Sequence, residues 1–359
     1  MGAKVDGKTC AARRIAGLDL LRLAAALAVM IFHYCYRGTA GQGLSQVAYP
    51  ELAGLAKYGF LGVDLFFMIS GFVIAASAEG RSALQFAMAR AGRLYPAHVV
   101  CMTLTAIVIA VWGFAPHKAS LLQWLANLTM LAPALRQPFM DGAYWSIVLE
   151  LVFYGWVAVL VGLGLFERRL LEIVAIWLAV CALNEMVLHV GALRNLALTE
   201  YGPLFASGVL IHRLWRGDKR PAVWALLAAA ATLEALHAYE VRADFVHLYN
   251  QPLDVPTLWL LQAALFGLFA GALWASRRIT ATPLVLALGG ITYPLYLLHQ
   301  NAGYVTLARL EPRVGRWAAL AIVIAAVIAM AWAIWRFAEP VGRRAIKRAF
   351  ARSGVTRWA

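Results

Sequence analysis

Apolar stretches long enough to cross a lipid bilayer recur along almost the whole chain, and they constrain its fold more than any other feature. A spanning helix needs about 20 apolar residues. Only helices and closed barrels satisfy their backbone hydrogen bonds in lipid. The sequence therefore predicts an all-α polytopic membrane protein with about ten transmembrane helices. Their approximate ranges are 16–36, 59–78, 94–114, 144–165, 170–189, 200–215, 221–238, 256–276, 283–305 and 317–338.

The composition excludes an ordinary soluble domain. Of the 359 residues, 62% are hydrophobic and 14% are charged, whereas soluble domains are about half apolar and a quarter charged. The first apolar run is too long for a signal peptide and no small-residue cleavage site follows it, so no cleavable signal is predicted. The net charge of +14 comes from basic residues that flank apolar runs. This pattern indicates membrane topology, so no nucleic-acid partner is expected.

The distribution of Lys and Arg predicts the orientation. With the N-terminus in the cytoplasm, about two thirds of the 32 basic residues fall in cytoplasmic segments. Cytoplasmic loops carry such an excess, and an even number of spans then also places the C-terminus in the cytoplasm. Residues 1–345 are predicted to form the membrane domain. Residues 346–359 are predicted to form a basic cytoplasmic tail beside anionic headgroups.

Several smaller features complete the organisation. The apolar segment 121–132 is too short to span and is predicted to be re-entrant or interfacial. The bend expected in the sixth span lies at Gly202–Pro203. The outer segment 237–256 mixes aromatic and polar residues that suit a sugar, although an ordinary solvated loop is an equal alternative. The cysteines have no metal-ligand spacing, so packing roles and no metal site are predicted for Cys10, Cys35, Cys101 and Cys181.

The first span, "RLAAALAVMIFHY", carries two groups that are expensive to bury. Arg22 and His33 are eleven residues apart, which is about 20° past three helical turns, so both side chains lie on one face roughly 16 Å apart. In the predicted topology Arg22 lies toward the cytoplasm and His33 toward the outer side. A fixed cation and a proton-transfer group therefore share one helix face.

Three further ionisable residues are predicted at the membrane depth of His33: Asp64, Glu150 and His299. Buried ionisable residues normally face the bundle interior and pair with one another. A histidine oriented by a carboxylate makes an effective general base. We therefore predict that His33 is the base, helped by Glu150 or Asp64. Helix–helix hydrogen bonding is the alternative role for each residue, and the role of His299 stays open.

A second group of polar residues lies in "RAGRLYPAH", on the cytoplasmic side of the third span. Arg90 and Arg93 are three residues apart, so they are neighbours on a helix face, and Tyr95 follows. Arginine binds phosphate oxygens through two parallel hydrogen bonds. The segment is a candidate phosphate site, with a purely topological role for its arginines as the alternative.

In these motifs the sequence resembles membrane acyltransferase family 3, whose polytopic members O-acylate bacterial surface glycans and some small molecules. The resemblance covers most of the chain. It is carried by the Arg-ten-His spacing of Arg22 and His33, "GVDLFFMISGFVI" around Asp64, the Arg-x-x-Arg pair in "RAGRLYP", "YWSIVLELVFY" around Glu150, "ITYPLYLLHQ" and "FAEPVGRR". After Glu150 the sequence departs from the family, because Leu151 follows where a polar residue is common.

The resemblance implies an acyl group, usually acetyl, moved from cytoplasmic acetyl-CoA to a hydroxyl of a carbohydrate or glycolipid acceptor at a bacterial inner membrane. It implies His33 as base or transient acyl carrier, and Arg22, Arg90, Arg93 and Tyr95 as donor-binding candidates. A proton-coupled secondary transporter is the alternative, since buried ionisable residues also mark proton relays. Transporters usually show internal repeats, and this sequence shows none. Assembly into homo-oligomers is left open.

Overall fold

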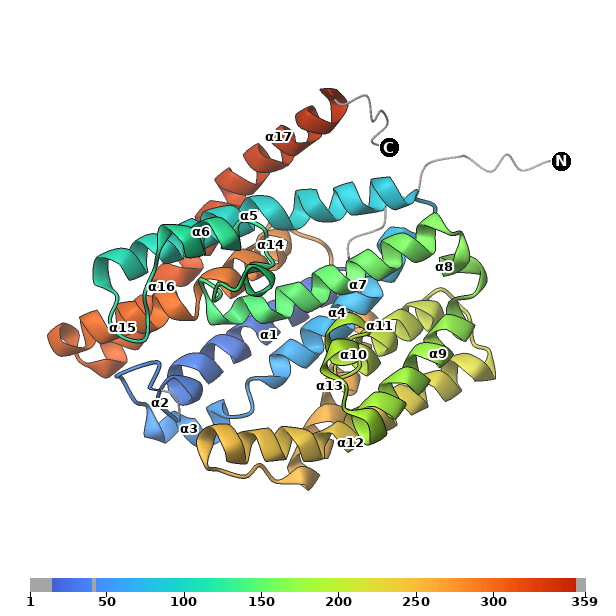
Figure 1. Cartoon of the computed structure of the whole chain (residues 1–359), viewed down its shortest axis with the longest axis horizontal. Helices are drawn as coiled ribbons and strands as arrows, with labels where there is room; N and C mark the ends of the chain where they lie inside the picture. Colours follow the sequence, from blue (N-terminus) through green and yellow to red (C-terminus); the bar gives the residue numbers. More distant parts are fainter. Residues whose placement is uncertain (1–14, 41–42, 353–359) are drawn as a thin grey trace.

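The computed structural model describes residues 15–40 and 43–352, and these residues form an all-α bundle without strands (Figure 1). The sequence-based predictions for Cys10 and for residues 1–14 and 353–359 lie outside the described residues. The α-helices are α1 (Ala16–Phe32), α2 (Gly38–Ala40), α3 (Pro50–Ala56), α4 (Leu61–Ala78), α5 (Ala83–Trp112), α6 (Leu121–Asn127), α7 (Trp145–Gly162), α8 (Leu165–Arg168), α9 (Leu170–Leu183), α10 (Gly191–Leu196), α11 (Gly202–Trp215), α12 (Pro221–Tyr249), α13 (Val255–Ala275), α14 (Pro283–Leu298), α15 (Asn301–Val314), α16 (Arg316–Ala333) and α17 (Glu339–Arg352).

Short segments of other helix types join these elements. The π-helical turns are η1 (His33–Arg37), η4 (Asn184–Leu188) and η5 (Ile334–Ala338), and the 3₁₀ turns are η2 (Ala132–Leu135) and η3 (Gly142–Tyr144). π-helical turns inside α-helices often occur at functional sites. The turn η1 begins at His33, one of the predicted site residues.

Every predicted span contains helix, but the helix lengths support fewer than ten crossings. Eight helices in the described residues are long and apolar enough to span a membrane. The sixth and ninth predicted spans are shorter: α11 has 14 residues and α14 has 16. Gly202 and Pro203 do not bend a helix but begin α11, because proline suits the first turn.

Two predicted boundaries differ in ways that bear on the site. Helix α5 begins at Ala83, eleven residues before the predicted span, because Ser82 and Gln85 form a capping box there. The segment 237–256, expected as an outer loop, is mostly part of α12, which continues to Tyr249. The short segment at 121–132 forms α6 and a turn, in agreement with its predicted inability to span.

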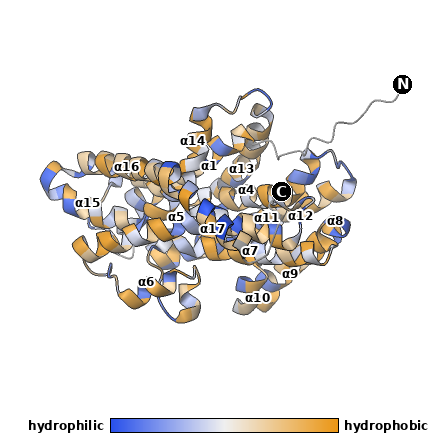
Figure 2. Ribbon diagram, turned by 90° about the horizontal axis from the view of Figure 1, so that it is seen from above, coloured by the Kyte–Doolittle hydropathy of each residue, from blue (hydrophilic) through white to orange (hydrophobic). Residues whose placement is uncertain are grey.

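The helices cross the molecule between two ends. Helices α2, α3 and α15 lie at the left end of Figure 1, and α8 lies at the right end. Because α2 and α3 follow α1, this helix runs from right to left; Arg22 is thus nearer the α8 end and His33 nearer the α15 end. In Figure 2, hydrophobic residues dominate the helices, while hydrophilic residues gather on α17 and near α15 and α8.

Helix α1 lies inside the bundle, where it packs against α4, α13 and α14. Helices α4 and α11 pack with their backbones in close contact. A Cβ atom added at Gly71 would lie 2.1 Å from the Phe205 carbonyl oxygen, and one at Gly208 would lie 2.0 Å from that of Met68. Small residues permit this approach in membrane proteins. The predicted packing roles of Cys35, Cys101 and Cys181 agree with their burial.

Candidate active site

A cavity of about 650 Å³ lies among α1, α4, α5, α7, α14 and α17. Its acidic lining residues are Asp19 and Glu150. Its basic lining residues are Arg22, Arg81, Arg90, Arg93, Arg343 and Lys347. The structure thus brings four predicted site residues, Arg22, Arg90, Arg93 and Glu150, to one cavity. The excess of positive charge suits a polyanionic ligand.

The two arginines of α5 have different partners. Arg93 donates hydrogen bonds of 3.1 and 3.0 Å from Nη1 to the two carboxylate oxygens of Glu339, which also pairs with Arg343. Glu339 is almost fully buried, so this ion pair fastens α17 to α5. Arg90 has no ion pair among the described residues, and its Nε atom is buried without a hydrogen-bond partner. Arg90 is therefore the more available cation of the pair.

Arg22 and Glu150 lie near each other in the cavity wall. Glu150 interacts electrostatically with Arg22 and Arg90, and Ser70 and Tyr154 lie within hydrogen-bonding reach of its carboxylate. Arg22 itself has no hydrogen bond or ion pair to the part of the chain that the structure describes. Glu150 therefore balances the charge of the arginines at a distance and leaves the Arg22 guanidinium available to a ligand.

Tyr95 does not belong to this cavity. Its side chain is 41% exposed and it is not a lining residue. A residue two positions after Arg93 lies about 200° around the helix and so faces away from it. The prediction that Tyr95 binds the donor therefore finds no support in its position.

His33 is paired with His299 instead of a carboxylate. Its Nδ1 atom lies 2.9 Å from the Val29 carbonyl oxygen and 2.9 Å from Nε2 of His299. Nδ1 of His299 lies 2.8 Å from the Tyr296 carbonyl oxygen. Carbonyl oxygens only accept hydrogen bonds, so both Nδ1 atoms carry hydrogen. Among the described residues, no carboxylate is hydrogen-bonded to His33.

This arrangement leaves one basic nitrogen available. With hydrogen on Nδ1, the Nε2 atom of neutral His33 carries a lone pair, and this atom is buried without a hydrogen-bond partner in the described structure. When Nε2 accepts a proton, Nδ1–H still donates to Val29 and to the lone pair on His299 Nε2. His299 and the Val29 carbonyl thus do what a carboxylate does in a catalytic triad: they fix the tautomer and stabilise the imidazolium.

The break between α14 and α15 sets the position of His299. The Asn301 N–H donates a 2.8 Å hydrogen bond to Oδ2 of Asp141, and the Ala143 N–H donates to Oδ1. The Tyr34 hydroxyl donates to the His299 carbonyl oxygen at 2.6 Å. Burial raises the pKa of Asp141 to about 7, although its hydrogen bonds and Arg37 act in the opposite direction. The ninth predicted span is therefore two helices, with His299 at the junction.

Tyr296 lies between the cavity and the histidine pair. It lines the cavity, and its ring centroid lies 5.4 Å from that of His299 and 5.4 Å from that of Phe66. Its hydroxyl oxygen is 2.7 Å from Oγ of Ser146. His33 and His299 do not line the cavity. The cationic cavity and the buried histidine pair are therefore adjacent, with Tyr296 between them.

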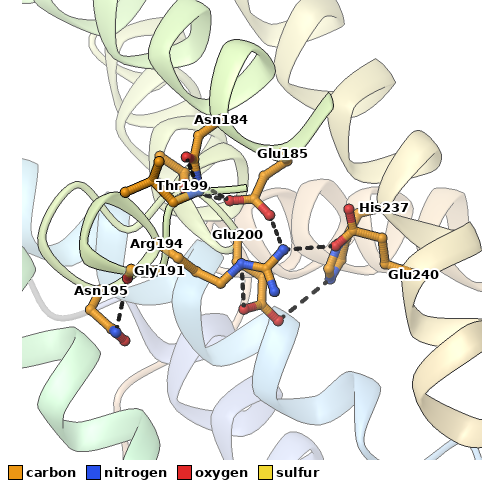
Figure 3. Close-up of polar contacts among 10 residues, drawn as sticks. Asn184, Glu185, Gly191, Arg194, Asn195, Thr199, Glu200, His237 and Glu240 are labelled. Carbon is orange, nitrogen blue, oxygen red and sulfur yellow. Dashed lines mark hydrogen bonds and ion pairs between the residues drawn. The ribbon is translucent and has the colours of Figure 1, made fainter. Parts of the chain in front are cut away.

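Asp64 neither lines the cavity nor contacts the histidine pair. It is buried at the start of α4 and interacts electrostatically with Glu234, Glu200 and His237. Beside this group, Arg194 binds Glu185, lies 3.1 Å from Oε2 of Glu240, and lies 3.7 Å from Oε2 of Glu200 (Figure 3). These contacts tie η4 and the start of α11 to α12. Asp64 is thus placed in a polar network that connects helices, away from His33.

Sequence reasoning missed Asp141, Tyr296 and Arg37, and it left the role of His299 open. Asp141 precedes the short turn before α7, a pattern typical of a helix cap, but its bond to Asn301 joins residues 160 apart. Tyr296 lies three residues before His299, so the two side chains are neighbours along α14. Arg37 follows His33 by four residues, and this helical spacing indicates that the two side chains are neighbours.

The comparisons with known proteins identify the family of the chain. Residues 15–336 match a family described as "Acyltransferase domain". The chain belongs to acyltransferase family 3. Nodulation protein 10 of Rhizobium leguminosarum bv. viciae is 26% identical over 356 residues, which cover 89% of this chain and 91% of that protein. The predicted family is therefore confirmed, and the chain is a membrane acyltransferase by membership.

Two further relatives of this acyltransferase family 3 chain have names that mention chemistry or a product. The exopolysaccharide production protein ExoZ of Rhizobium meliloti is 27% identical over 258 residues, or 68% of this chain and 76% of that protein. The O-acetyl transferase of Shigella phage Sf6 is 38% identical over 88 residues, or 24% of each chain. No solved structure matches the chain significantly.

Proposed function

We propose that this protein is a bacterial inner-membrane O-acyltransferase that moves an acetyl group from cytoplasmic acetyl-CoA to a hydroxyl of a carbohydrate acceptor. The acceptor would be a surface polysaccharide, lipopolysaccharide, exopolysaccharide or a glycolipid precursor. The observation that carries the proposal is the adjacency of a strongly cationic cavity and a buried histidine base. The names of ExoZ and the Sf6 O-acetyl transferase support a glycan acceptor and an acetyl group.

The cavity has the charge that a coenzyme A thioester requires. Coenzyme A carries a 3′-phosphate and a pyrophosphate, and arginine forks bind phosphate oxygens well. In the proposal Arg90 and Arg93 hold these phosphates, with Arg81, Arg343 and Lys347 nearby. In the proposal Arg22 lies deeper in the cavity and donates hydrogen bonds to the pantetheine arm of the donor, which reaches on toward His33.

The chemistry proposed at His33 is general-base catalysis. Nε2 of His33 accepts the proton of the acceptor hydroxyl while the oxygen attacks the thioester carbon. The new C–O bond forms, the C–S bond breaks, and the thiolate of coenzyme A leaves toward the cationic cavity. The proton that His33 accepted is passed to this thiolate, which returns His33 to its neutral form. A base in this role contributes about 10²–10⁴-fold. For the acyl group to reach His33, Tyr296 has to move or the thioester has to pass along its ring.

The test uses the purified full chain in lipid nanodiscs with acetyl-CoA and surface polysaccharide. His33→Ala should abolish acceptor-dependent thiol release, because the variant lacks the Nε2 lone pair that accepts the hydroxyl proton. The dissociation constant for coenzyme A should stay within about twofold, because His33 does not line the cavity. His247→Ala, which removes an exposed histidine from α12, is the matched control and should leave both quantities unchanged.

Two results would contradict the proposal. Thiol release by His33→Ala near the wild-type rate would remove His33 as the base. Accumulation of a solute in vesicles, driven by a proton gradient and without consumption of acetyl-CoA, would instead identify the transporter that the sequence left as the alternative.

A further inference from the structure

Arg37 is a cation beside the catalytic histidine that lies outside the donor cavity. It is the last residue of the π-helical turn η1, four positions after His33. It is half-buried, and it has no hydrogen bond or ion pair to any residue in the described ranges. Its Nε atom is buried without a partner. A guanidinium so placed has lost part of its hydration and gained no direct counter-ion, which is costly in a membrane protein.

Other polar atoms without partners lie near Arg37. The Tyr304 ring packs against Gly38, where an added Cβ would lie 2.9 Å from its Cε1 atom, and it lies 6.4 Å from the His33 ring centroid. The Tyr304 hydroxyl and Nε2 of His33, which belong to residues that interact electrostatically with Arg37, are buried without hydrogen-bond partners in the described structure. Buried polar groups normally have hydrogen-bond partners. Polar atoms without partners beside His33 are therefore typical of a site that binds a ligand.

The acidic residue near Arg37 does not pair with it. Asp141 interacts with Arg37 electrostatically, but its two oxygens already accept the N–H groups of Ala143 and Asn301. The Arg37 guanidinium therefore keeps its hydrogen-bonding capacity for another oxyanion.

Aromatic side chains also lie near Arg37, since Tyr36 precedes it in the chain and Tyr249 interacts with it electrostatically. Tyr36 stacks on Phe245 with ring centroids 6.0 Å apart and contacts Tyr249 at 5.3 Å. The Tyr36 hydroxyl lies 3.3 Å from Oε1 of Gln251. These residues come from the end of α12 and the segment after it, part of the range that the sequence suggested for acceptor recognition. Aromatic faces and amide groups are suitable neighbours for a sugar.

We propose that Arg37 binds an anionic group, a carboxylate or a phosphate, on the carbohydrate acceptor and thereby holds the acceptor hydroxyl at Nε2 of His33. Arginine pairs with both groups through its planar fork. This inference rests on the proposed function and adds the substrate class: an acidic glycan, either through a uronic acid or through a phosphate. The donor would bind on the cavity side of Tyr296 and the acidic acceptor on the side of His33.

The experiment compares acceptors and variants in nanodiscs with acetyl-CoA. The acceptors are a glucuronic-acid oligosaccharide, the same oligosaccharide with its carboxyl reduced to an alcohol, and a phosphorylated form of the reduced one. The variants are Arg37→Gln and Arg37→Lys. Arg313→Gln, which changes an exposed arginine of α15 outside the segment suggested for acceptor recognition, is the control. Measurements are kcat/KM for each acceptor and direct acceptor binding by equilibrium dialysis.

The wild type should favour an acidic acceptor over the neutral one by about 10- to 100-fold, the range that a hydrogen-bonded charge pair supplies. Arg37→Gln should remove this preference, Arg37→Lys should keep part of it, and coenzyme A binding should not change. The acidic acceptor with the higher kcat/KM shows whether Arg37 binds a carboxylate or a phosphate.

Each contrary result has a defined meaning. Equal acylation of acidic and neutral acceptors by the wild type, or an unchanged preference in Arg37→Gln, overturns the inference and leaves the proposed function intact. If the wild type acylates no acceptor, the proposed function fails. The dialysis measurement then still decides the inference, because acidic saccharides must bind the wild type more tightly than Arg37→Gln.

Discussion

At the scale of single residues, the site depends on which atoms already have partners. Nδ1 of His33 is held by a carbonyl oxygen and by His299, which leaves Nε2 as the available base. Arg93 is held by Glu339, whereas Arg90 is not. These differences cannot be read from the sequence motifs, in which the two arginines are equivalent, and they separate the roles of neighbouring residues.

His299→Ala should lower kcat by about 10- to 100-fold, because loss of a hydrogen bond to a developing charge costs about 1.5–3 kcal/mol. The KM for the acyl donor should be unchanged. His98→Ala is the matched control: His98 is as deeply buried and contacts the Asn127 carbonyl oxygen, but it lies outside the site. Steady-state kinetics measure both variants, and equal kcat values for His299→Ala and the wild type would exclude the orienting role.

Arg90→Ala should raise the apparent KM for the acyl donor about tenfold with little loss of thermal stability, because Arg90 has no ion pair to lose. Arg93→Ala should lower the melting temperature as well, because it removes a partner from the buried Glu339. Glu339→Gln in the Arg93→Ala background should recover part of that stability. An unchanged KM in both single variants would limit these arginines to setting topology.

At the scale of helices, the sequence predicted which segments are helical far better than which helices lie side by side. Each predicted span contains helix, because a long apolar segment in lipid can satisfy its backbone hydrogen bonds only within a helix or a closed barrel. The shared depth of His33, Asp64 and Glu150 did not bring them together, since depth says nothing about which neighbour a helix face meets. Glu150 turns to the cavity arginines and Asp64 to Glu234. The break before α15 depended on Asp141, a contact 160 residues away in sequence.

Helix packing yields a prediction about α4 and α11. Gly208→Ala should destabilise the protein by about 1–3 kcal/mol, because its Cβ would lie 2.0 Å from the Met68 carbonyl oxygen and would push the helices apart. Gly267→Ala in α13 is the control, because a Cβ there meets nothing within 4 Å. Denaturation in mixed micelles measures both variants, and equal stabilities would show that the helices can adjust without cost.

At the scale of the whole molecule, the two ends of the bundle differ in chemistry. The cationic cavity is lined by residues from the first turns of α1 and from α17. His33 and Arg37 lie in η1, which leads into α2, and His299 lies between α14 and α15. The hydrophilic helix α17 brings Arg343 and Lys347 to the cavity and runs across the predicted boundary between domain and tail. This polarity matches the direction in which the proposed acyl transfer proceeds, from a cytoplasmic donor to an outer acceptor.

The orientation can be measured with single cysteines. In a variant whose native cysteines are replaced by alanine, Glu167→Cys in α8 should react with a membrane-impermeant maleimide only after permeabilisation. Arg313→Cys in α15 should react in intact spheroplasts, because the Lys and Arg distribution places α8 in the cytoplasm. Labelling in the reverse order would invert the proposed topology and place the cationic cavity outside.

The position of Tyr296 between the cavity and the histidine pair has a consequence for the proton gradient across the membrane. A bacterial inner membrane holds a potential in which each 100 mV is worth about 2.3 kcal/mol per elementary charge. A continuous chain of water molecules between the cavity at Arg22 and His33 would let protons cross the membrane, driven by this potential. Tyr296, which packs against Phe66 and is hydrogen-bonded to Ser146, lies between the cavity and the His299 ring, where it would interrupt such a chain of water. In the proposed function, the side chain that separates the donor cavity from His33 would therefore also limit proton leakage across the membrane.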